Sequence, residues 1–251
     1  MKNLAEEWTR RLLVDAGVRE GMRVLDIGCG GGNVTFLAAE LVGARGHVVG
    51  LDRDAAPLEA ARQRARELGV THVDFVCADL GSPLDGHGPF DAVIGRRVLM
   101  YQPDAVACLT RLAAVLAPGG LIVLQEHDAT AMPVCQPELP LHRQVSGWMW
   151  ETVAREGADL RMGLHLAPAL EKAGFTVERV RAEATVLTPT QSHPIGYILR
   201  AMRGRIVAKG VATEEALALD TIDERLAEEL RTAHGTCLWE MVFGAWARKA
   251  G

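Results

Sequence analysis

The sequence predicts an α/β fold, in which a mainly parallel sheet carries helices on both faces. Apolar runs alternate with helical patterns through the first two thirds of the 251 residues, as in folds built from strand–helix–strand units. The first apolar run leads through a glycine-rich turn into a helical pattern, and three successive runs carry an aspartate at or near their ends. A chain of this length can bury roughly 70% of its unfolded surface.

The predicted elements follow in chain order. The first helix places Leu4, Trp8, Leu12 and Leu13 on one face. Strands and helices then alternate. The helix that begins at Asn33 is predicted to stop at Gly43, and the next helix is predicted to start near Pro57 and stop at Gly69. The five strands of this part are "RVLDIG", "GHVVGLDRD", "HVDFVCADL", "FDAVIGRR" and "LIVLQEHD", and the helices between them are "NVTFLAAELVG", "PLEAARQRARELG" and "DAVACLTRLAAVLAPGG".

The alternation breaks after the fifth strand. Residues 129–160 combine a proline-containing loop with a helix that carries Trp148 and Trp150, and residues 190–235 indicate two helices. Between and after these segments we predict a helix, a sixth strand and a last strand in "LHLAPALEKAGF", "TVERVRAEATVL" and "CLWEMVFGAWARK". We therefore expect a single domain over residues 1–251, with helical cap insertions at 129–160 and 190–235.

Composition excludes several classes of protein. The formal net charge of −5 disfavours a general nucleic-acid binder, which needs clustered Lys and Arg. The five cysteines form no CxxC pair, so we expect reduced thiols and neither a disulfide framework nor a zinc site. The first residues lack the apolar core of a signal peptide, and no apolar run is long enough to span a membrane. We expect a cytoplasmic protein.

The glycine-rich turn "VLDIGCGGG" indicates a ligand that the backbone approaches closely. A dinucleotide fingerprint requires a third glycine at position 33, which is Asn33, and no GK[ST] of a phosphate loop follows. Asp26 would also repel a pyrophosphate at short range. S-adenosylmethionine fits better, because it joins an adenosine to a positively charged sulfonium and amino acid and carries no phosphate.

Two further aspartates lie where this ligand needs them. Asp52 ends the second strand and can accept hydrogen bonds from both ribose hydroxyls. Asp79 ends the third strand and can accept from the adenine amine, while Leu80 packs on the ring. Each aspartate alone could be a helix or turn cap, but three at successive strand ends beside the glycine turn favour a cofactor site.

The chain resembles the class I S-adenosylmethionine-dependent methyltransferases, in the small-molecule methyltransferase-domain branch. The resemblance covers about residues 20–128, through "VLDIGCGGG", "GLDRD", "CADL", "FDAVIGRRVLMYQPD" and "LAPGGLIVLQEHD". It implies a Rossmann-like, seven-stranded sheet, mostly parallel with an antiparallel last strand. It also implies a cofactor site formed by Asp26, Gly28 and Gly30 at the methionine end, Asp52 at the ribose, and Asp79 with Leu80 at the adenine.

Arg53 and Arg96, which adjoin the second and fourth strand ends, are added to the expected cofactor site. Arg96, Arg97, Met100 and Tyr101 stand where many family members have small residues followed by histidines. The wall near the reacting methyl group therefore differs from theirs.

Candidate catalytic residues come from the ends of the fourth and fifth strands, where Tyr101 and then Glu126, His127 and Asp128 lie. An imidazole titrates near neutral pH, so His127 is the leading general base for an O–H or N–H acceptor. The alternative is that His127 only caps the strand end, and Tyr101 can equally be a pocket wall. No metal-ligand set is present, so we expect no metal site.

The segment "YILRAMRGRIVAK" brings together Arg200, Arg203, Arg205 and Lys209. Such a run is typical of a solvated helix face, but an arginine turned inward could bind a carboxylate or phosphate on the acceptor.

We thus expect an enzyme that transfers a methyl group from S-adenosylmethionine to an oxygen or nitrogen of a small organic molecule. We expect no nucleic-acid or membrane partner, and a homodimer is compatible with this prediction. One alternative is a protein that binds S-adenosylmethionine without transferring the methyl group, and another is a nucleic-acid methyltransferase. The second lacks the [ND]PP[YFW]-type stretch after the fourth strand, which reads "GRRVLM".

Overall fold

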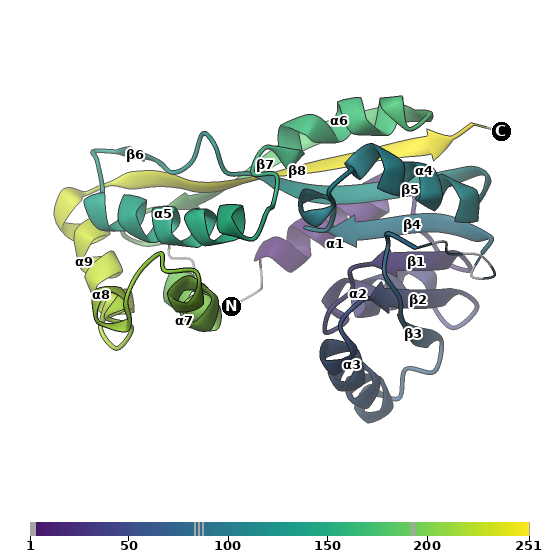
Figure 1. The fold of residues 1–251 in the computed structure, drawn as a ribbon, viewed down its shortest axis with the longest axis horizontal. Helices are drawn as coiled ribbons and strands as arrows, with labels where there is room; N and C mark the ends of the chain where they lie inside the picture. Colours follow the sequence, from purple (N-terminus) through teal and green to yellow (C-terminus); the bar gives the residue numbers. More distant parts are fainter. Residues whose placement is uncertain (1–3, 83, 85, 87, 192–193, 251) are drawn as a thin grey trace. The chain divides into compact units, whose positions relative to one another are not determined.

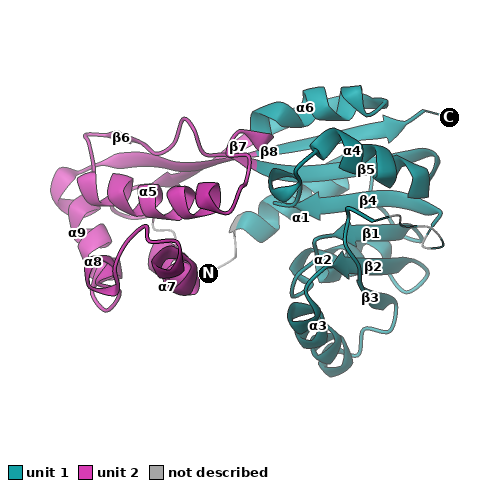
Figure 2. Cartoon of the chain, viewed as in Figure 1, with its two compact units in different colours: residues 1–126, 163–181, 243–251 teal, residues 127–162, 182–242 magenta. Residues whose placement is uncertain are grey.

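The computed structural model describes residues 4–82, 84, 86, 88–191 and 194–250. The chain divides into two compact units, coloured separately in Figure 2. Unit 1 comprises residues 1–126, 163–181 and 243–251, and unit 2 comprises residues 127–162 and 182–242.

Unit 1 contains the predicted parallel sheet, with hydrogen-bonded strand order β3-β2-β1-β4-β5 followed by β8 (Figure 1). Each neighbouring pair from β3 to β5 is parallel. The strands are β1 (Arg23–Ile27), β2 (His47–Asp52), β3 (Val73–Cys77), β4 (Phe90–Arg96), β5 (Leu116–Asp128) and β8 (Thr236–Lys249), of which β5 and β8 also run into unit 2. The mostly parallel α/β sheet predicted from the sequence is confirmed.

The helices of unit 1 follow the predicted order. They are α1 (Leu4–Ala16), α2 (Asn33–Val42), α3 (Ala55–Leu68), the short 3₁₀ helix η1 (Leu99–Tyr101), α4 (Ala105–Val115) and α6 (Met162–Lys172), of which Met162 belongs to unit 2. Helix α3 ends at Leu68, and the residue after it, Gly69, has a left-handed φ of 66°, which confirms the predicted stop.

One hydrophobic core of unit 1 lies between a sheet face and the first three helices. Leu12 and Leu13 of α1, Leu37 of α2 and Leu58 of α3 are buried with strand residues such as Val24. Burial of large aliphatic side chains is worth about 1.5–3 kcal/mol each. This packing fixes the strand ends on which the candidate site is built.

Unit 2 is formed by helices around the ends of β7 (Phe175–Leu187) and β8, which pair with each other. The helices are α5 (Pro140–Arg155), α7 (Ile195–Ala208), α8 (Glu214–Leu217) and α9 (Ile222–Ala233). Both segments expected as cap insertions lie in unit 2. Their action as caps stays a prediction, and so does the single domain over residues 1–251.

Two details of the sequence prediction are corrected in unit 2. The loop after β5 contains a strand, β6 (Val134–Gln136), which pairs antiparallel with β8 and makes the sheet eight-stranded. Three residues are too few to show a periodic pattern, and the pairing partner lies about 100 residues away. Residues 190–235 contain α7, α8 and α9, because the single turn α8 separates the two predicted helices.

The basic residues of α7 do not form the inward clamp that the sequence left open. Arg200 pairs with Asp223, Arg203 with Glu214 and Arg205 with Glu156, while Lys209 donates to the Arg155 carbonyl. These contacts connect α7 to α9, to α8 and to the end of α5. The basic segment therefore stabilises unit 2.

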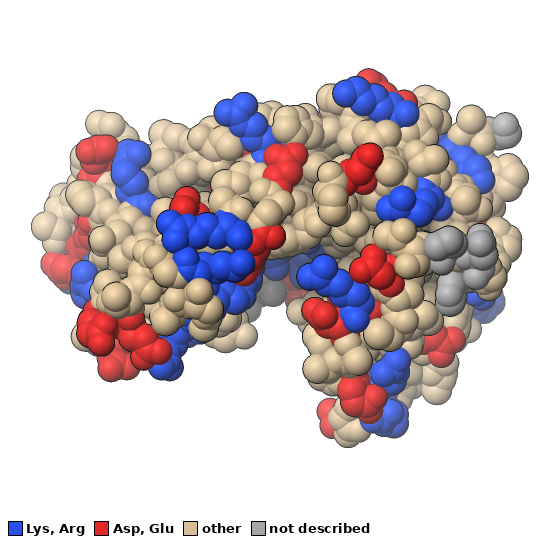
Figure 3. Space-filling model, viewed as in Figure 1, with Lys and Arg blue, Asp and Glu red and all other residues tan. Residues whose placement is uncertain are grey.

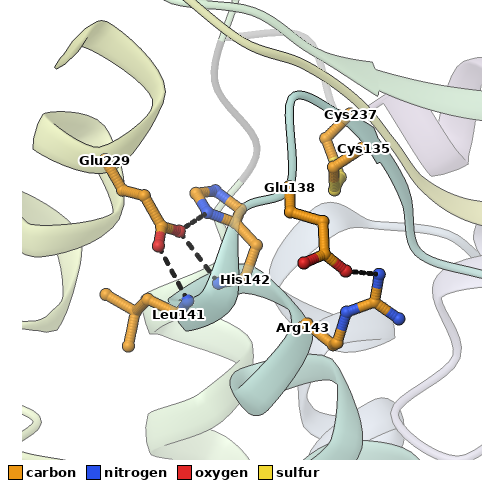
Figure 4. The surroundings of a disulfide bond; sticks show 7 residues. All are labelled: Cys135, Glu138, Leu141, His142, Arg143, Glu229 and Cys237. Atoms are coloured by element: carbon orange, nitrogen blue, oxygen red, sulfur yellow. Dashed lines mark hydrogen bonds and ion pairs between the residues drawn. A yellow bond between two sulfur atoms is a disulfide. The ribbon is translucent and has the colours of Figure 1, made fainter. Parts of the chain in front are cut away.

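A disulfide joins Cys135 of β6 to Cys237 of β8 (Figure 4). The expectation of reduced thiols without any disulfide is wrong for this pair. The two cysteines are 102 residues apart in sequence, and the register of β6 on β8 places them directly opposite each other. Cysteine spacing carries no signal of such a pairing, which strand register creates. Cys29, Cys77 and Cys108 are free.

The disulfide predicts a thiol count that can be measured. Unfolded, unreduced protein should titrate three thiols with Ellman's reagent, since Cys29, Cys77 and Cys108 are free, and all five after reduction. Replacing Cys135 and Cys237 by serine should lower the free energy of unfolding by about 2–4 kcal/mol, because a long loop is no longer closed in the unfolded chain. Cys77→Ser, at an exposed free thiol, is the control. Five reactive thiols before reduction would contradict the pairing.

Candidate functional site

The glycine-rich turn after β1 adopts a backbone that side chains disfavour. Gly28, Gly30 and Gly32 have φ values of 58°, 51° and 81°, in the left-handed region that glycine enters without steric cost. A Cβ on Gly28 would also lie 2.6 Å from Cγ2 of Val98. The turn therefore brings bare backbone to the carboxyl end of the sheet, as the sequence predicted.

Asp26 lies within β1 just before this turn, and its side chain is 1% exposed. Its Oδ2 accepts a hydrogen bond of 2.6 Å from the Thr35 hydroxyl of α2. Burial raises the pKa of Asp26 to about 7, although the Thr35 hydrogen bond and the nearby Arg96 charge act to lower it. A cation bound beside this carboxyl group would be stabilised by its ionised form.

Asp52, the last residue of β2, is tied to the glycine turn. Its Oδ2 accepts from the Gly30 N–H at 2.8 Å, and its Oδ1 accepts from the Asp54 N–H at 3.0 Å. The carboxylate thus holds the turn in place and retains lone pairs for further donors, because each carboxylate oxygen accepts two hydrogen bonds. A pair of ribose hydroxyls is such a donor pair.

The residues after β2 and β3 complete the predicted cofactor set. Arg53 is exposed, and its carbonyl accepts from the Cys77 thiol. Asp79 is exposed and accepts from the Gly81 N–H at 2.5 Å. Leu80 is 6% exposed. The turn after β3 is therefore partly formed by Asp79 itself, while Leu80 offers an apolar wall beside it.

Arg96, at the end of β4, belongs to a buried polar network that the sequence did not indicate. It donates to the Thr9 hydroxyl at 3.2 Å, and Thr9 donates to Oε1 of Gln125 at 2.7 Å. Burial, and then the like charge of Arg97, lower the pKa of Arg96, while Asp26 and Glu6 oppose this shift. Thr9 and Gln125 match no motif, since only tertiary packing of α1 against the sheet brings them to Arg96.

Glu126, a candidate residue at the end of the fifth predicted strand, has a backbone-binding role that the sequence did not indicate. Its side chain is fully buried, and Oε1 accepts from the backbone N–H groups of Val98 and Leu99 at 2.9 and 2.8 Å. Burial raises the pKa of Glu126 to about 7. The carboxyl group thereby holds the turn from β4 into η1, which ends at Tyr101. The Tyr101 side chain is 38% exposed, and its catalytic role stays a prediction.

His127 opens unit 2 and has a carboxylate partner there. Its Nε2 lies 3.2 Å from Oε2 of Glu240 on β8, and Oε1 of Glu240 accepts from the Thr185 hydroxyl of β7 at 3.1 Å. The Trp150 ring of α5 is 5.5 Å from the imidazole, centroid to centroid. Nδ1 of His127 is buried and has no hydrogen-bond partner among the described residues.

The structure thus collects part of the predicted site in one unit. Asp26, Gly28, Gly30, Asp52, Arg53, Asp79, Leu80 and Arg96 all lie in unit 1, in or just after β1, β2, β3 and β4, and Tyr101 lies there too, whereas His127 belongs to unit 2. Within the described ranges, no cluster of three or more His, Cys, Asp or Glu could hold a metal, and the absence of a metal site stays a prediction. None of the helices in the described part of the chain is both long and apolar enough to cross a membrane.

The chain matches known methyltransferases in sequence. A family model described as a methyltransferase domain matches residues 18–174. Aklanonic acid methyltransferase DauC of Streptomyces sp. strain C5 is 38% identical over 131 residues, which is 51% of this chain and 60% of that protein. Trans-aconitate 2-methyltransferase of Rhizobium leguminosarum bv. trifolii is 35% identical over 157 residues, which is 62% of this chain and 57% of that protein.

Proteins that are named for other activities have the same fold. The crystal structure of the [4+2]-cyclase SpnF matches 98% of this chain and 82% of its own, with a TM-score of 0.61 and 21% identity. The chain spans only 52–60% of the length of eight curated relatives that it matches in sequence.

The buried carboxyl groups predict a pH dependence of stability. The pKa values of Asp26 and Glu126 are about 7 in the folded protein, against 3.8 and 4.5 ordinarily. The folded state therefore binds more protons than the unfolded state between about pH 4 and 7, and the free energy of unfolding should fall as the pH rises through this window.

Glu126→Gln should remove part of this fall, roughly 1–3 kcal/mol between pH 5 and 8, because its amide oxygen can still accept from Val98 and Leu99 but does not titrate. Urea unfolding at the two pH values measures the effect. Glu67→Gln, at an exposed residue of α3, is the control. An unchanged slope in the Glu126 variant would show that this carboxyl group is not protonated in the folded protein.

Proposed function

This chain belongs to the class I S-adenosylmethionine-dependent methyltransferases, and we propose that it transfers a methyl group from S-adenosylmethionine to an oxygen or nitrogen of a small organic molecule. The observation that carries the proposal is the hydrogen bond from the Gly30 N–H to Asp52. This bond joins the glycine turn to Asp52, the residue expected to bind the ribose, so that both belong to one surface of unit 1.

The residues of unit 1 fit S-adenosylmethionine by charge. Asp26 and Asp52 supply carboxyl groups beside a turn of bare backbone, which suits a ligand with a cationic end and a ribose and disfavours a pyrophosphate. Leu80 supplies an apolar surface, and the exposed Asp79 carboxylate can accept from an amine. When bound, the cofactor supplies a methyl group on a positively charged sulfur.

The work left to the protein is positioning and proton removal. A displacement at an activated methyl carbon gains much of its acceleration from holding the nucleophile in line. Glu126 holds the turn that leads to Tyr101 through two backbone hydrogen bonds. These bonds support a role of this turn as a rigid wall of the acceptor pocket. An acceptor with an O–H or N–H group also has to lose a proton, and His127 is the proposed base.

Named relatives support a small-molecule acceptor. Two of them are named for aklanonic acid and trans-aconitate, the molecules that those proteins methylate. This chain spans only 60% and 57% of them, so the class of acceptor is carried over as a proposal and its identity is not. The surface supports the same class, because Lys and Arg are interspersed with Asp and Glu on the face drawn in Figure 3, whereas nucleic-acid binding favours clustered basic residues.

Binding of the cofactor without methyl transfer is the second candidate. The fold is compatible with it, since the crystal structure of a [4+2]-cyclase shares this fold at 21% sequence identity. Release of S-adenosylhomocysteine in the presence of phenols, amines or carboxylic acids separates the two functions. A protein that binds S-adenosylmethionine and releases no S-adenosylhomocysteine with any such acceptor would contradict the proposed transfer.

The cofactor site predicts a loss of affinity in Asp52→Ala. Removal of the carboxylate deletes hydrogen-bond acceptors for the ribose and frees the Gly30 N–H, so S-adenosylhomocysteine should bind more weakly by about 1.5–3 kcal/mol. Isothermal titration calorimetry measures the change. Asp74→Ala is the control, since Asp74 is an exposed carboxylate of β3 that pairs with His47 and should leave the affinity unchanged. Equal affinities in the folded Asp52 variant and the wild type would remove Asp52 from the site.

A further inference from the structure

We propose that Arg96 binds the carboxylate at the amino acid end of the cofactor, and that Thr9 and Gln125 orient its guanidinium for this role. All three residues belong to unit 1. The position of Arg96 next to a strand end put it in the expected cofactor site without giving it a chemical role. The inference rests on the cofactor of the proposed function, and it is independent of the acceptor and of the atom that is methylated.

Arg96 ends β4 on the same face of the sheet as Asp26. Strand β4 lies between β1 and β5 (Figure 1), and Asp26 of β1 is in register with Ile94. Side chains alternate between the two faces of a sheet, so Arg96 shares the face of Ile94 and lies two residues further toward the carboxyl end. Gly28 lies two residues beyond Asp26 in the same direction. Arg96 therefore stands beside the start of the glycine turn.

The guanidinium of Arg96 has no carboxylate partner among the residues that the structure describes. Arg96 is half-buried, and its guanidinium donates one hydrogen bond within this part of the chain, to the Thr9 hydroxyl at 3.2 Å. The charges of Asp26 and Glu6 favour the charged form of Arg96, but neither carboxyl group forms an ion pair with it. A guanidinium carries several N–H donors, so most of them are left for solvent or a ligand.

Asp26 and Arg96 together complement a ligand that carries both charges. The amino acid end of S-adenosylmethionine has an ammonium group and a carboxylate. Oδ2 of Asp26 is bound by the Thr35 hydroxyl at 2.6 Å and not by Arg96, so each charged group remains available to the ligand. Arginine suits the carboxylate, because its planar fork can donate two parallel hydrogen bonds to it. A phosphate would suit Arg96 as well, but Asp26 would repel it.

Thr9 and Gln125 fix the direction of the guanidinium. Both residues are buried, and Gln125 of β5 is in register with Arg96. The Thr9 hydroxyl oxygen lies 2.7 Å from Oε1 of Gln125 and 2.7 Å from the Ala5 carbonyl oxygen. Its proton is therefore directed away from Arg96, and a lone pair faces the guanidinium. Thr9 and Gln125 are positioning residues, because they act through Arg96.

A purely structural role of this network makes a different prediction. If Arg96 only attached α1 to the sheet, its loss would weaken the binding of every ligand of the cofactor site to the same extent. If Arg96 binds the cofactor carboxylate, its loss affects only ligands that have this carboxylate. A comparison of two ligands in the same variant separates the two roles, and it also cancels a partial loss of folded protein.

Isothermal titration calorimetry with two ligands tests the proposal in the full chain. S-adenosylhomocysteine has the complete amino acid end, whereas decarboxylated S-adenosylhomocysteine keeps the adenosine, the sulfur and the amine. Arg96→Gln should weaken the binding of S-adenosylhomocysteine about 10- to 100-fold, the scale of hydrogen bonds to a charged partner. The affinity for the decarboxylated ligand should stay close to that of the wild type. Arg96→Lys should lose less, because it keeps the charge but not the planar fork.

Variants of Thr9 test its positioning role. Thr9→Val removes the lone pair that faces Arg96, so the affinity for S-adenosylhomocysteine alone should fall about 3- to 10-fold. Thr9→Ser keeps the hydroxyl and should restore the wild-type affinity. The matched control is Thr110→Val, at an exposed residue of α4 whose hydroxyl donates to the Val106 carbonyl at 2.9 Å. Arg66→Gln, at an exposed arginine of α3, is the control for loss of a positive charge.

Several outcomes would overturn the proposal. An equal loss of affinity for both ligands in Arg96→Gln would assign a structural role to Arg96, and unchanged affinities would remove it from the cofactor site. Slower methyl transfer with unchanged S-adenosylhomocysteine binding would place a carboxylate of the acceptor at Arg96 instead. Wild-type affinity in Thr9→Val would refute the orienting role of Thr9.

The binding measurements also separate this inference from the proposed function. A wild-type protein that does not bind S-adenosylhomocysteine would overturn the cofactor site and the role of Arg96 with it. A protein that binds S-adenosylhomocysteine selectively through Arg96, but transfers a methyl group to no phenol, amine or carboxylic acid, would contradict the proposed transfer and support the role of Arg96.

Discussion

The left-handed glycine turn after β1 is the constraint on which the cofactor side of this protein depends. Gly28, Gly30 and Gly32 carry positive φ values, so the chain can leave the strand, turn beneath a ligand and enter α2 within a few residues. The Gly30 N–H is bound by Asp52, which joins the turn to the end of β2. A side chain at Gly28 would collide with Val98, so the turn also restricts the path of the chain after β4.

Around this turn, unit 1 buries two carboxyl groups at strand ends, although burial of apolar side chains there would cost less free energy. Asp26 and Glu126 are almost completely buried and have pKa values of about 7. Each receives hydrogen bonds that hold a neighbouring element: Thr35 of α2 for Asp26, and the start of η1 for Glu126. Strongly shifted pKa values are typical of functional positions, and a cation beside either carboxyl group would favour its ionised form.

Unit 2 has many polar contacts between its segments. Arginines of α7 pair with carboxylates from neighbouring segments, two histidines pair with glutamates, and a disulfide joins β6 to β8. Exposed ion pairs contribute little each, so the buried apolar side chains of α7 and α9, such as Leu199 and Ile222, supply more of the stability. Glu229 accepts from the backbone N–H groups of Leu141 and His142 at the start of α5 and pairs with the His142 ring, whereas Glu240 faces the His127 ring.

Local periodicity and backbone chemistry encode the alternation of strands and helices, the glycine turn and the aspartates at three successive strand ends, so the sequence alone sufficed to predict them. Other features emerged only in the folded chain. They are the Cys135–Cys237 disulfide, the strand β6, the Arg96–Thr9–Gln125 network and the pairing of His127 with Glu240. Each of these joins residues far apart in the chain, and strand register and helix packing, rather than spacing, bring such residues together. The same limit left the arginines of α7 ambiguous, since a short basic segment has the same sequence whether its side chains face solvent, a ligand or the neighbouring carboxylates.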